Sequence, residues 1–142
     1  MINLRHVGLI VDDIDKSYEL YRDILGFIPK IDQIEQGKFF DHLTGLKSAI
    51  ARTAKCYSED GTCIELIQYK SLKSDKRKKH LTCDGFNHIA LNVDDIDLLH
   101  IKLDSIGIEF INKPMLNFEE TAKVAFCRDF EGNLLELVQT KL

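Results

Sequence analysis

The run His6-Val-Gly-Leu-Ile-Val-Asp-Asp-Ile-Asp15 returns almost unchanged as His88-Ile-Ala-Leu-Asn-Val-Asp-Asp-Ile-Asp97, and seven of the ten positions are identical. Each half of the chain then closes on a second repeated motif. The first copy is Asp60-Gly-Thr-Cys-Ile-Glu65-Leu-Ile-Gln68, and the second is Glu131-Gly-Asn-Leu-Leu-Glu136-Leu-Val-Gln139. A repeat of this kind indicates two copies of one supersecondary unit.

Each half predicts the same order of elements: a strand, a helix and three further strands. The first helix is expected to begin at Asp13 or Asp15 as N-cap, to carry Tyr18 to Leu25 and to end at Gly26. The second is expected over about 95–106, ended by Gly107, and residues 39–45 favour a short helix or turn. Strands are expected at 4–11, 27–34, 47–57 and 62–69, then at 85–93, 108–112, 121–129 and 133–140. The fold class is therefore α+β, built from two tandem βαβββ modules.

Strand alternation predicts where the repeated ionisable residues point. Residues i and i+2 share one face of a strand. The apolar positions that follow each histidine are expected to face the helices, which places His6 and His88 on the opposite face, beside the small residues Gly8 and Ala90. By the same rule, Glu65 and Glu136 share the face of the histidines.

Four such residues on one predicted face indicate a divalent-metal site formed by His6, Glu65, His88 and Glu136. A lone histidine in a strand is more often a hydrogen-bonded core residue, and a lone glutamate often pairs with lysine or arginine. Two carboxylates on one wall, however, repel each other unless a cation compensates them. Imidazole and carboxylate ligands without thiolate suit Ni²⁺, Co²⁺, Mn²⁺, Fe²⁺ or Zn²⁺, and open positions on the ion would admit water or substrate.

Composition excludes several classes of partner. A net charge of −4 over 142 residues leaves no excess of cations for a nucleic-acid backbone. We find no leader pattern and no apolar stretch of about 20 residues, so no membrane partner is expected and the cytoplasm is the expected compartment. The four cysteines show no Cys-x-x-Cys spacing and are expected to be reduced and mostly buried.

Three features of the chain resemble the vicinal oxygen chelate superfamily, which includes glyoxalase I and the bleomycin resistance and dioxygenase proteins. They are the paired His-x-x-Leu-x-Val-Asp-Asp-Ile-Asp runs, the segment Tyr21-Arg-Asp-Ile-Leu-Gly26-Phe and the two Glu-Leu-[Ile/Val]-Gln closings. The resemblance covers His6 to Gln139. It implies one domain over residues 1–142, with modules at about 1–69 and 85–142 joined by a basic linker at 70–84. It further implies an open, cup-shaped barrel around a metal ion.

Within the superfamily, the ligand set resembles glyoxalase I, with His6 and Glu65 from one module and His88 and Glu136 from the other. Extradiol dioxygenases and fosfomycin-resistance enzymes use two histidines and one glutamate. Methylmalonyl-CoA epimerase is similar in length and linker but typically has a glutamine-type ligand where Glu65 stands. Glyoxalase I has a shorter linker, and the segment 40–46 fits neither enzyme closely.

The resemblance implies a metal-dependent lyase or isomerase that moves a proton next to a metal-bound carbonyl of a small carbonyl compound or thioester. We expect Glu136 to act as the base and Glu65 to serve the opposite face of the substrate. An epimerase is the nearest alternative. A protein that binds an antibiotic or metabolite without turnover, and a metal-dependent dioxygenase, are further ones. Free sheet edges favour a homodimer.

Several cationic and imidazole side chains outside the repeat have open roles. The linker cations suit either a solvated connector or an electrostatic lip for an anionic thioester or glutathione conjugate. Arg52 and Arg128 are alternative anion anchors, and the histidines without a repeat partner are expected at the surface or in structural positions. The linker cations are Lys70, Lys73, Lys76, Arg77, Lys78 and Lys79, and the histidines without a repeat partner are His42, His80 and His100.

Overall fold

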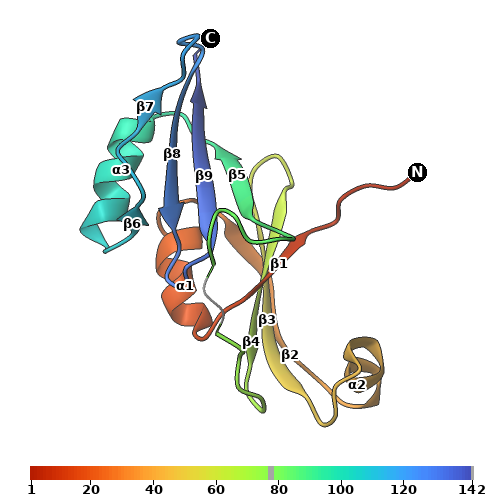
Figure 1. Cartoon of the computed structure of the whole chain (residues 1–142). Coiled ribbons are helices and arrows are strands. Elements are labelled where there is room, and N and C mark those ends of the chain that lie inside the picture. The colour runs from red at the N-terminus through yellow and green to blue at the C-terminus, as the bar shows by residue number, and fades with distance from the viewer. Residues whose placement is uncertain (77–78, 142) are drawn as a thin grey trace. The chain divides into compact units, whose positions relative to one another are not determined.

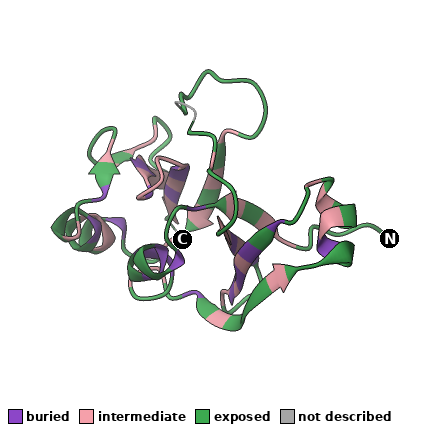
Figure 2. Cartoon of the chain, turned by 90° about the horizontal axis from the view of Figure 1, so that it is seen from below, coloured by how far each residue is buried: buried purple, intermediate pink, exposed green. Residues whose placement is uncertain are grey.

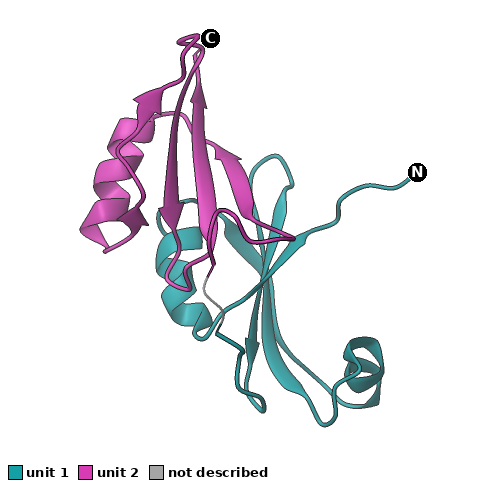
Figure 3. Ribbon diagram, viewed as in Figure 1, with its two compact units in different colours: residues 1–76 teal, residues 77–142 magenta. Residues whose placement is uncertain are grey.

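The computed structural model describes residues 1–76 and 79–141, which form two compact units, Met1–Lys76 and Arg77–Leu142 (Figures 1 and 3). Two positions of the predicted basic linker, Arg77 and Lys78, lie outside the described residues. Each unit follows the predicted βαβββ order, with an additional short helix in the first unit and an additional short strand in the second. The predicted α+β fold is confirmed. None of the described helices has the length and apolar character needed to cross a bilayer.

The first unit is a four-stranded sheet with a helix packed on one face. Its elements are β1 (Val7–Ile10), α1 (Ile14–Tyr21), β2 (Ile28–Gln36), α2 (Lys38–Thr44), β3 (Ile50–Tyr57) and β4 (Cys63–Tyr69). The strand order is β1-β4-β3-β2. The β1–β4 pair is parallel and the other two pairs are antiparallel. The two strands that carry the repeated His and Glu motifs are therefore direct neighbours.

The second unit has the same central arrangement. Its elements are β5 (His88–Asn92), α3 (Ile96–Ser105), β6 (Glu109–Phe110), β7 (Met115–Leu116), β8 (Ala122–Arg128) and β9 (Leu134–Thr140). The strand order is β5-β9-β8-β6, and β7 also pairs with β8. The predicted strand over 108–112 is reduced to the two residues of β6. The short β7, which follows Pro114, has no sequence alternation long enough to predict it.

The helices begin as the repeated aspartates predict. Asp13 is the N-cap of α1, and its side chain accepts hydrogen bonds from the backbone N–H groups of Asp15 and Lys16. Asp95 caps α3 in the same way. Of the two residues considered, Asp13 is thus the cap, while Asp15 lies within the first turn.

The first helix is shorter than its apolar spacing predicts. α1 ends at Tyr21, and the next residues form turns as far as Gly26. Gly26 has a φ of 76°, the left-handed conformation expected of a glycine that ends a helical segment. In the second unit Gly107, with a φ of 81°, has the same role after α3.

The core of each unit lies between its helix and one face of its sheet. Ile64 and Leu66 on β4 are buried, and so are Leu135 and Leu137 on β9. The glutamate between each pair is half-buried. Buried residues alternate with more exposed ones along several of the strands (Figure 2). Alternation therefore separates the two faces as predicted, with the apolar rows toward the helices and the glutamates on the other side.

The cysteines are consistent with reduced, mostly buried thiols. Cys56, Cys63 and Cys127 are buried, Cys83 is exposed, and none of the four forms a disulfide within the described residues. Burial raises the pKa of the Cys56 thiol to about 11 and that of Cys127 to about 12. Both thiols therefore stay protonated near neutral pH, where nucleophilic or metal-binding thiolates are not available from them.

Candidate metal-binding residues

His6 and Glu65 form a close pair on the first sheet. In the parallel register of β1 and β4, Gly8 lies beside Glu65, so the side chain of His6, two residues earlier, is on the same face. His6 Nε2 lies 3.0 Å from Glu65 Oε2. The second carboxylate oxygen of Glu65, Oε1, is 3.6 Å from the ammonium of Lys55. Glu65 thus has an imidazole on one oxygen and a cation near the other.

His88 and Glu136 form the corresponding pair on the second sheet. Ala90 lies beside Glu136 in the parallel register of β5 and β9, the same relation that Gly8 has to Glu65. His88 Nε2 is 3.3 Å from Glu136 Oε2. Phe126 on β8 lies directly across from Glu136, and its ring meets the His88 ring edge-on at 5.1 Å between centroids. The second pair therefore has an aromatic neighbour where the first has an ammonium.

Asn87 orients the ring of His88. Its amide Nδ2 donates to the carbonyls of His80 (3.2 Å) and Leu81 (2.9 Å), which turns Oδ1 toward His88 Nδ1 at 2.9 Å. Because an amide oxygen only accepts hydrogen bonds, Nδ1 carries the ring proton and a neutral His88 presents the lone pair of Nε2 to Glu136. Two electron-rich atoms in this arrangement are stabilised by a cation between them, either a proton or a metal ion.

Both pairs fit a divalent metal ion by their chemistry and spacing. Two donor atoms that each lie about 2.1 Å from an ion, at right angles to each other, are about 3.0 Å apart. The Nε2–Oε2 separations of 3.0 and 3.3 Å are close to this value. Within the described part of either unit, no third His, Cys, Asp or Glu joins the pair. Each unit by itself therefore contains two candidate ligands.

Comparisons with known proteins identify the family. A family model described as the Glyoxalase/Bleomycin resistance protein/Dioxygenase superfamily matches residues 3–137. The chain belongs to this superfamily. Superfamily members bind small molecules and are typically dependent on a divalent metal ion. The resemblance that the repeated motifs indicate is thereby confirmed for nearly the whole chain.

Individual superfamily relatives are distant. A probable lactoylglutathione lyase of Synechocystis sp. is 30% identical over 138 residues, which cover 96% of this chain and 95% of the relative. The uncharacterized protein YraH of Bacillus subtilis is 28% identical and covers 96% and 97% of the two chains. A crystal structure of a glyoxalase family protein from Bacillus cereus has a TM-score of 0.90 at 22% identity, covering 99% of this chain and 95% of that one. The last comparison supports the fold alone.

The short helix α2 covers the same face of the first sheet as the His6–Glu65 pair. Phe40 of α2 packs in a cluster with Ala51 of β3, and Ile67 and Tyr69 of β4 pack against that cluster. Ile67 and Tyr69 are two and four residues beyond Glu65, so all three share a face. The segment that matched neither superfamily enzyme closely thus forms an apolar cluster on the same sheet face as the His6–Glu65 pair, and His42 in this segment is exposed.

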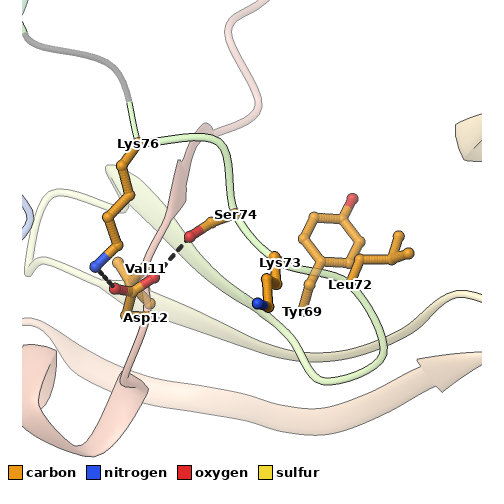
Figure 4. Close-up of a pocket in the computed structure, with 7 residues that line it drawn as sticks. All are labelled: Val11, Asp12, Tyr69, Leu72, Lys73, Ser74 and Lys76. Carbon is orange, nitrogen blue, oxygen red and sulfur yellow. Dashed lines mark hydrogen bonds and ion pairs between the residues drawn. The ribbon is translucent and has the colours of Figure 1, made fainter.

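A pocket of about 300 Å³ lies at the other end of β1 and β4 (Figure 4). His6 precedes β1, whereas the pocket is bounded by Val11 and Asp12 beyond it and by the start of the linker. Asp12 accepts a hydrogen bond from Ser74 at 2.7 Å and forms an ion pair with Lys76, which holds the pKa of Asp12 below its ordinary value. The pocket therefore marks where the linker docks on the first unit, away from the histidine–glutamate pair.

Arg52 and Arg128, the two alternative anion anchors predicted from the sequence, both donate hydrogen bonds to other groups of the protein. Arg52 donates to Asp32 and Asp15 at 2.8 to 2.9 Å. Arg128 donates to the backbone carbonyls of Lys79 (2.8 Å) and Gly132 (3.1 Å). These contacts explain both arginines without a bound anion. Lys79 itself donates to Asn133 at 2.6 Å.

Three neighbours of the candidate ligands were not predicted from the sequence. Asn87 precedes the repeated histidine, but its contact depends on carbonyls of the linker. Lys55 and Phe126 lie across from the glutamates, and only the register of the hairpins identifies them. The adjacent glycine-containing turns predict hairpins, but they do not say which residue faces which.

Proposed function

We propose that this protein is a divalent-metal-dependent lyase or isomerase of the glyoxalase I type, with both modules acting as one domain. The observation that carries the proposal is a histidine–glutamate pair at the same register in both units, with Nε2–Oε2 separations of 3.0 and 3.3 Å. The 30% identity to a probable lactoylglutathione lyase supports the same class of reaction.

In this proposal His6, Glu65, His88 and Glu136 hold one ion of Ni, Co, Zn, Mn or Fe. When bound, the ion supplies a Lewis acid that polarises a carbonyl of the substrate. The protein orients the ligands. Asn87 keeps Nε2 of His88 available, and the sheets keep each glutamate beside its histidine. Imidazole and carboxylate donors suit this group of borderline metals.

The glutamates have different surroundings, which support different roles. Lys55 is near Glu65 Oε1. Among the described residues, the only cationic or titratable nitrogen that contacts Glu136 is that of His88. Glu136 is therefore the side chain better able to leave its partner and take a proton from the carbon next to the carbonyl. Glu65, which has His6 on one oxygen and Lys55 at 3.6 Å from the other, serves the opposite face of the substrate. In the net reaction a proton moves from the carbon that bears a hydroxyl to the neighbouring carbonyl carbon, and the hydroxyl proton moves to the former carbonyl oxygen.

Elemental analysis tests the metal site directly. Untagged protein purified without chelator is expected to contain about one transition-metal ion per chain. His6→Ala and Glu136→Ala are each expected to lose it, and exposed His42→Ala is the control that keeps it. Wild-type protein that holds no metal and takes none up on titration contradicts the proposal and favours a binding protein without turnover.

Kinetics of Glu136→Gln test the assignment of the base. The assay uses a small carbonyl compound or thioester that the wild type turns over, and the lactoylglutathione lyase reaction is tested first. Loss of a general base is expected to lower kcat about 10² to 10⁴-fold, while metal content is measured in parallel. Near-normal turnover with metal still bound would remove Glu136 from this role.

We also infer that the protein forms a homodimer. Within the described residues, β1 and β2 are the edges of the first sheet and β5 and β6 those of the second. Unpaired strand edges favour association with another chain. Sedimentation of the purified protein is expected to give twice the mass of the 16.3 kDa chain, and a monomer at micromolar concentration contradicts the inference.

A further inference from the structure

Lys55 lies on the same face of the first sheet as the candidate ligands. It pairs with Glu65 across the antiparallel strands β3 and β4, and directly opposed residues share a face. Its side chain is 21% exposed. The sheet thus places a mostly covered ammonium beside Glu65.

The internal repeat shows that the fold does not require a cation at this position. In the second unit the residue across from the glutamate is Phe126, although the register of strands is the same. The sheet of the second unit therefore forms with an aromatic side chain at the matching position. The ammonium of Lys55 is therefore a specific feature of the first half of the site.

The contact between Lys55 and Glu65 leaves the N–H donors of the ammonium without a hydrogen-bond acceptor among the described residues. Its Nζ is 3.6 Å from Oε1, and within the described part of the chain it makes no hydrogen bond. Lys123, by contrast, donates to both oxygens of Asp97 at 2.7 and 2.6 Å. A lysine ammonium has three N–H donors. Those of Lys55 are available to a ligand that approaches the same face.

The charge count of the proposed site gives the class of that ligand. Two ionised glutamates balance one divalent ion, so Lys55 leaves the site with one surplus positive charge. We propose that Lys55 is a specificity-determining residue that binds a carboxylate or other oxyanion group of the substrate, beside the carbonyl that reacts. This inference rests on the proposed function and narrows its substrates to anionic carbonyl compounds.

Two hydroxamic acids with the same metal-binding group test the proposal. Acetohydroxamic acid has no further charge, whereas the monohydroxamate of succinic acid also bears a carboxylate. The full chain is loaded with Co²⁺, whose visible absorption reports binding of either probe. Wild-type protein, Lys55→Met, Lys55→Gln, Lys55→Arg and the exposed control Lys47→Met are compared, with thermal unfolding to verify that each variant folds.

Wild-type protein is expected to prefer the carboxylate-bearing probe by about tenfold to a hundredfold, as one charged hydrogen bond provides. Lys55→Met and Lys55→Gln are expected to lose that preference and to keep their affinity for acetohydroxamic acid. Lys55→Arg should retain most of the preference, and Lys47→Met all of it.

Other outcomes overturn the inference in distinguishable ways. Equal binding of both probes by cobalt-loaded wild type, or an unchanged preference in Lys55→Met, overturns the role of Lys55 but leaves the proposed metal-dependent function in place. An equal loss of affinity for both probes in Lys55→Met indicates a purely structural role and also overturns it. Wild-type protein that does not take up Co²⁺ overturns the proposed function and this inference together.

Discussion

Asn87 and Lys55 show how single neighbours distinguish two otherwise similar histidine–glutamate pairs. Asn87 is itself held by two backbone carbonyls, so its oxygen can only face His88 Nδ1. In metal sites, a contact of this kind fixes the tautomer and ring orientation of the ligating histidine. Lys55 instead acts on the carboxylate of its pair. The repeat thus supplies the candidate ligands, and residues outside it set the ring orientation of His88 and the charge beside Glu65.

Replacing Asn87 with alanine is expected to weaken metal binding about 10- to 100-fold, because His88 loses the acceptor that orients its ring. Competition against a metal-indicator dye measures the change. Exposed Asn112→Ala in the same unit is the control and should leave the affinity unaltered. Equal affinities for Asn87→Ala and wild type contradict the role given to this amide.

The elements are joined by contacts that also repeat between the two halves. Gln68 Oε1 accepts from the backbone N–H of Ile14 at 3.4 Å, and Gln139 Oε1 accepts from that of Ile96 at 2.9 Å. The glutamine of each closing motif therefore fastens the start of a helix to the neighbouring strand. This contact satisfies one of the backbone donors that a helix leaves unpaired at its N-terminus.

Gln139→Leu is expected to lower the free energy of unfolding by about 1 to 3 kcal/mol, because the buried N–H of Ile96 loses its acceptor. Urea unfolding followed by circular dichroism measures the difference. Gln36→Leu, at an exposed position near the end of β2, provides the comparison and should change the value little. A loss of less than a few tenths of a kcal/mol in Gln139→Leu would show that water replaces the glutamine.

A second repeated contact joins each helix to a strand cation. Asp15 of α1 accepts from Arg52 on β3, and Asp97 of α3 accepts from Lys123 on β8. Arg52 also binds Asp32 on β2, and this guanidinium, with a smaller contribution from the Tyr18 hydroxyl, holds the pKa of Asp32 below its ordinary value. Arg52 thus connects three elements of the first unit.

Arg52→Met is expected to lower the free energy of unfolding by about 0.5 to 1 kcal/mol at pH 7, since the ion pairs are partly exposed. A carboxyl whose pKa is lowered on folding stabilises the protein above its ordinary pKa, about 3.9. That stability is lost as the pH falls through the lower folded value. Urea unfolding curves of Arg52→Met and wild type should therefore converge as the pH falls below the lowered pKa of Asp32.

The exposed neighbouring pair of Arg22 and Asp23 provides the control for this prediction. Arg22→Met is expected to change the free energy of unfolding by less than about 0.5 kcal/mol. A difference between Arg52→Met and wild type that persists undiminished into acid would assign the loss of stability to the packing of the arginine stem instead of its charge.

At the scale of the whole molecule, the superfamily match extends over both modules, residues 3–137, and each unit carries one histidine–glutamate pair. Within the described residues of either unit, no larger group of metal-binding side chains is present. A single four-ligand site would therefore couple the stability of both modules to one ion.

Metal at about 100 times its Kd is expected to raise the free energy of unfolding by about 2.7 kcal/mol, because the ion binds the folded protein alone. His6→Ala and Glu136→Ala, one from each module, should both abolish this gain, and His42→Ala should keep it. Thermal unfolding with and without chelator measures the effect. A gain that only one of the two variants abolishes would indicate that the modules bind metal separately.

The sequence alone predicted the α+β class, two copies of one unit and the sheet face of all four candidate ligands. It placed the start of α3 near Asp95 and left the start of α1 open between Asp13 and Asp15. These features depend on local rules, namely the period of a strand, the capping of a helix by Asp13 or Asp95 and the repeat itself. A residue and its copy obey the same rules in both halves, so the paired motifs were sufficient to predict these features.

Which residues face one another across neighbouring strands could be read from the folded structure but not from the sequence. The placement of Lys55 opposite Glu65, and of Phe126 opposite Glu136, follows from the register of each hairpin. That register depends on the geometry of the connecting turn and on packing of the whole sheet. The carbonyls that orient Asn87 come from a segment without periodicity. Contacts between residues that are distant in sequence, or held by irregular chain, leave no local pattern to read.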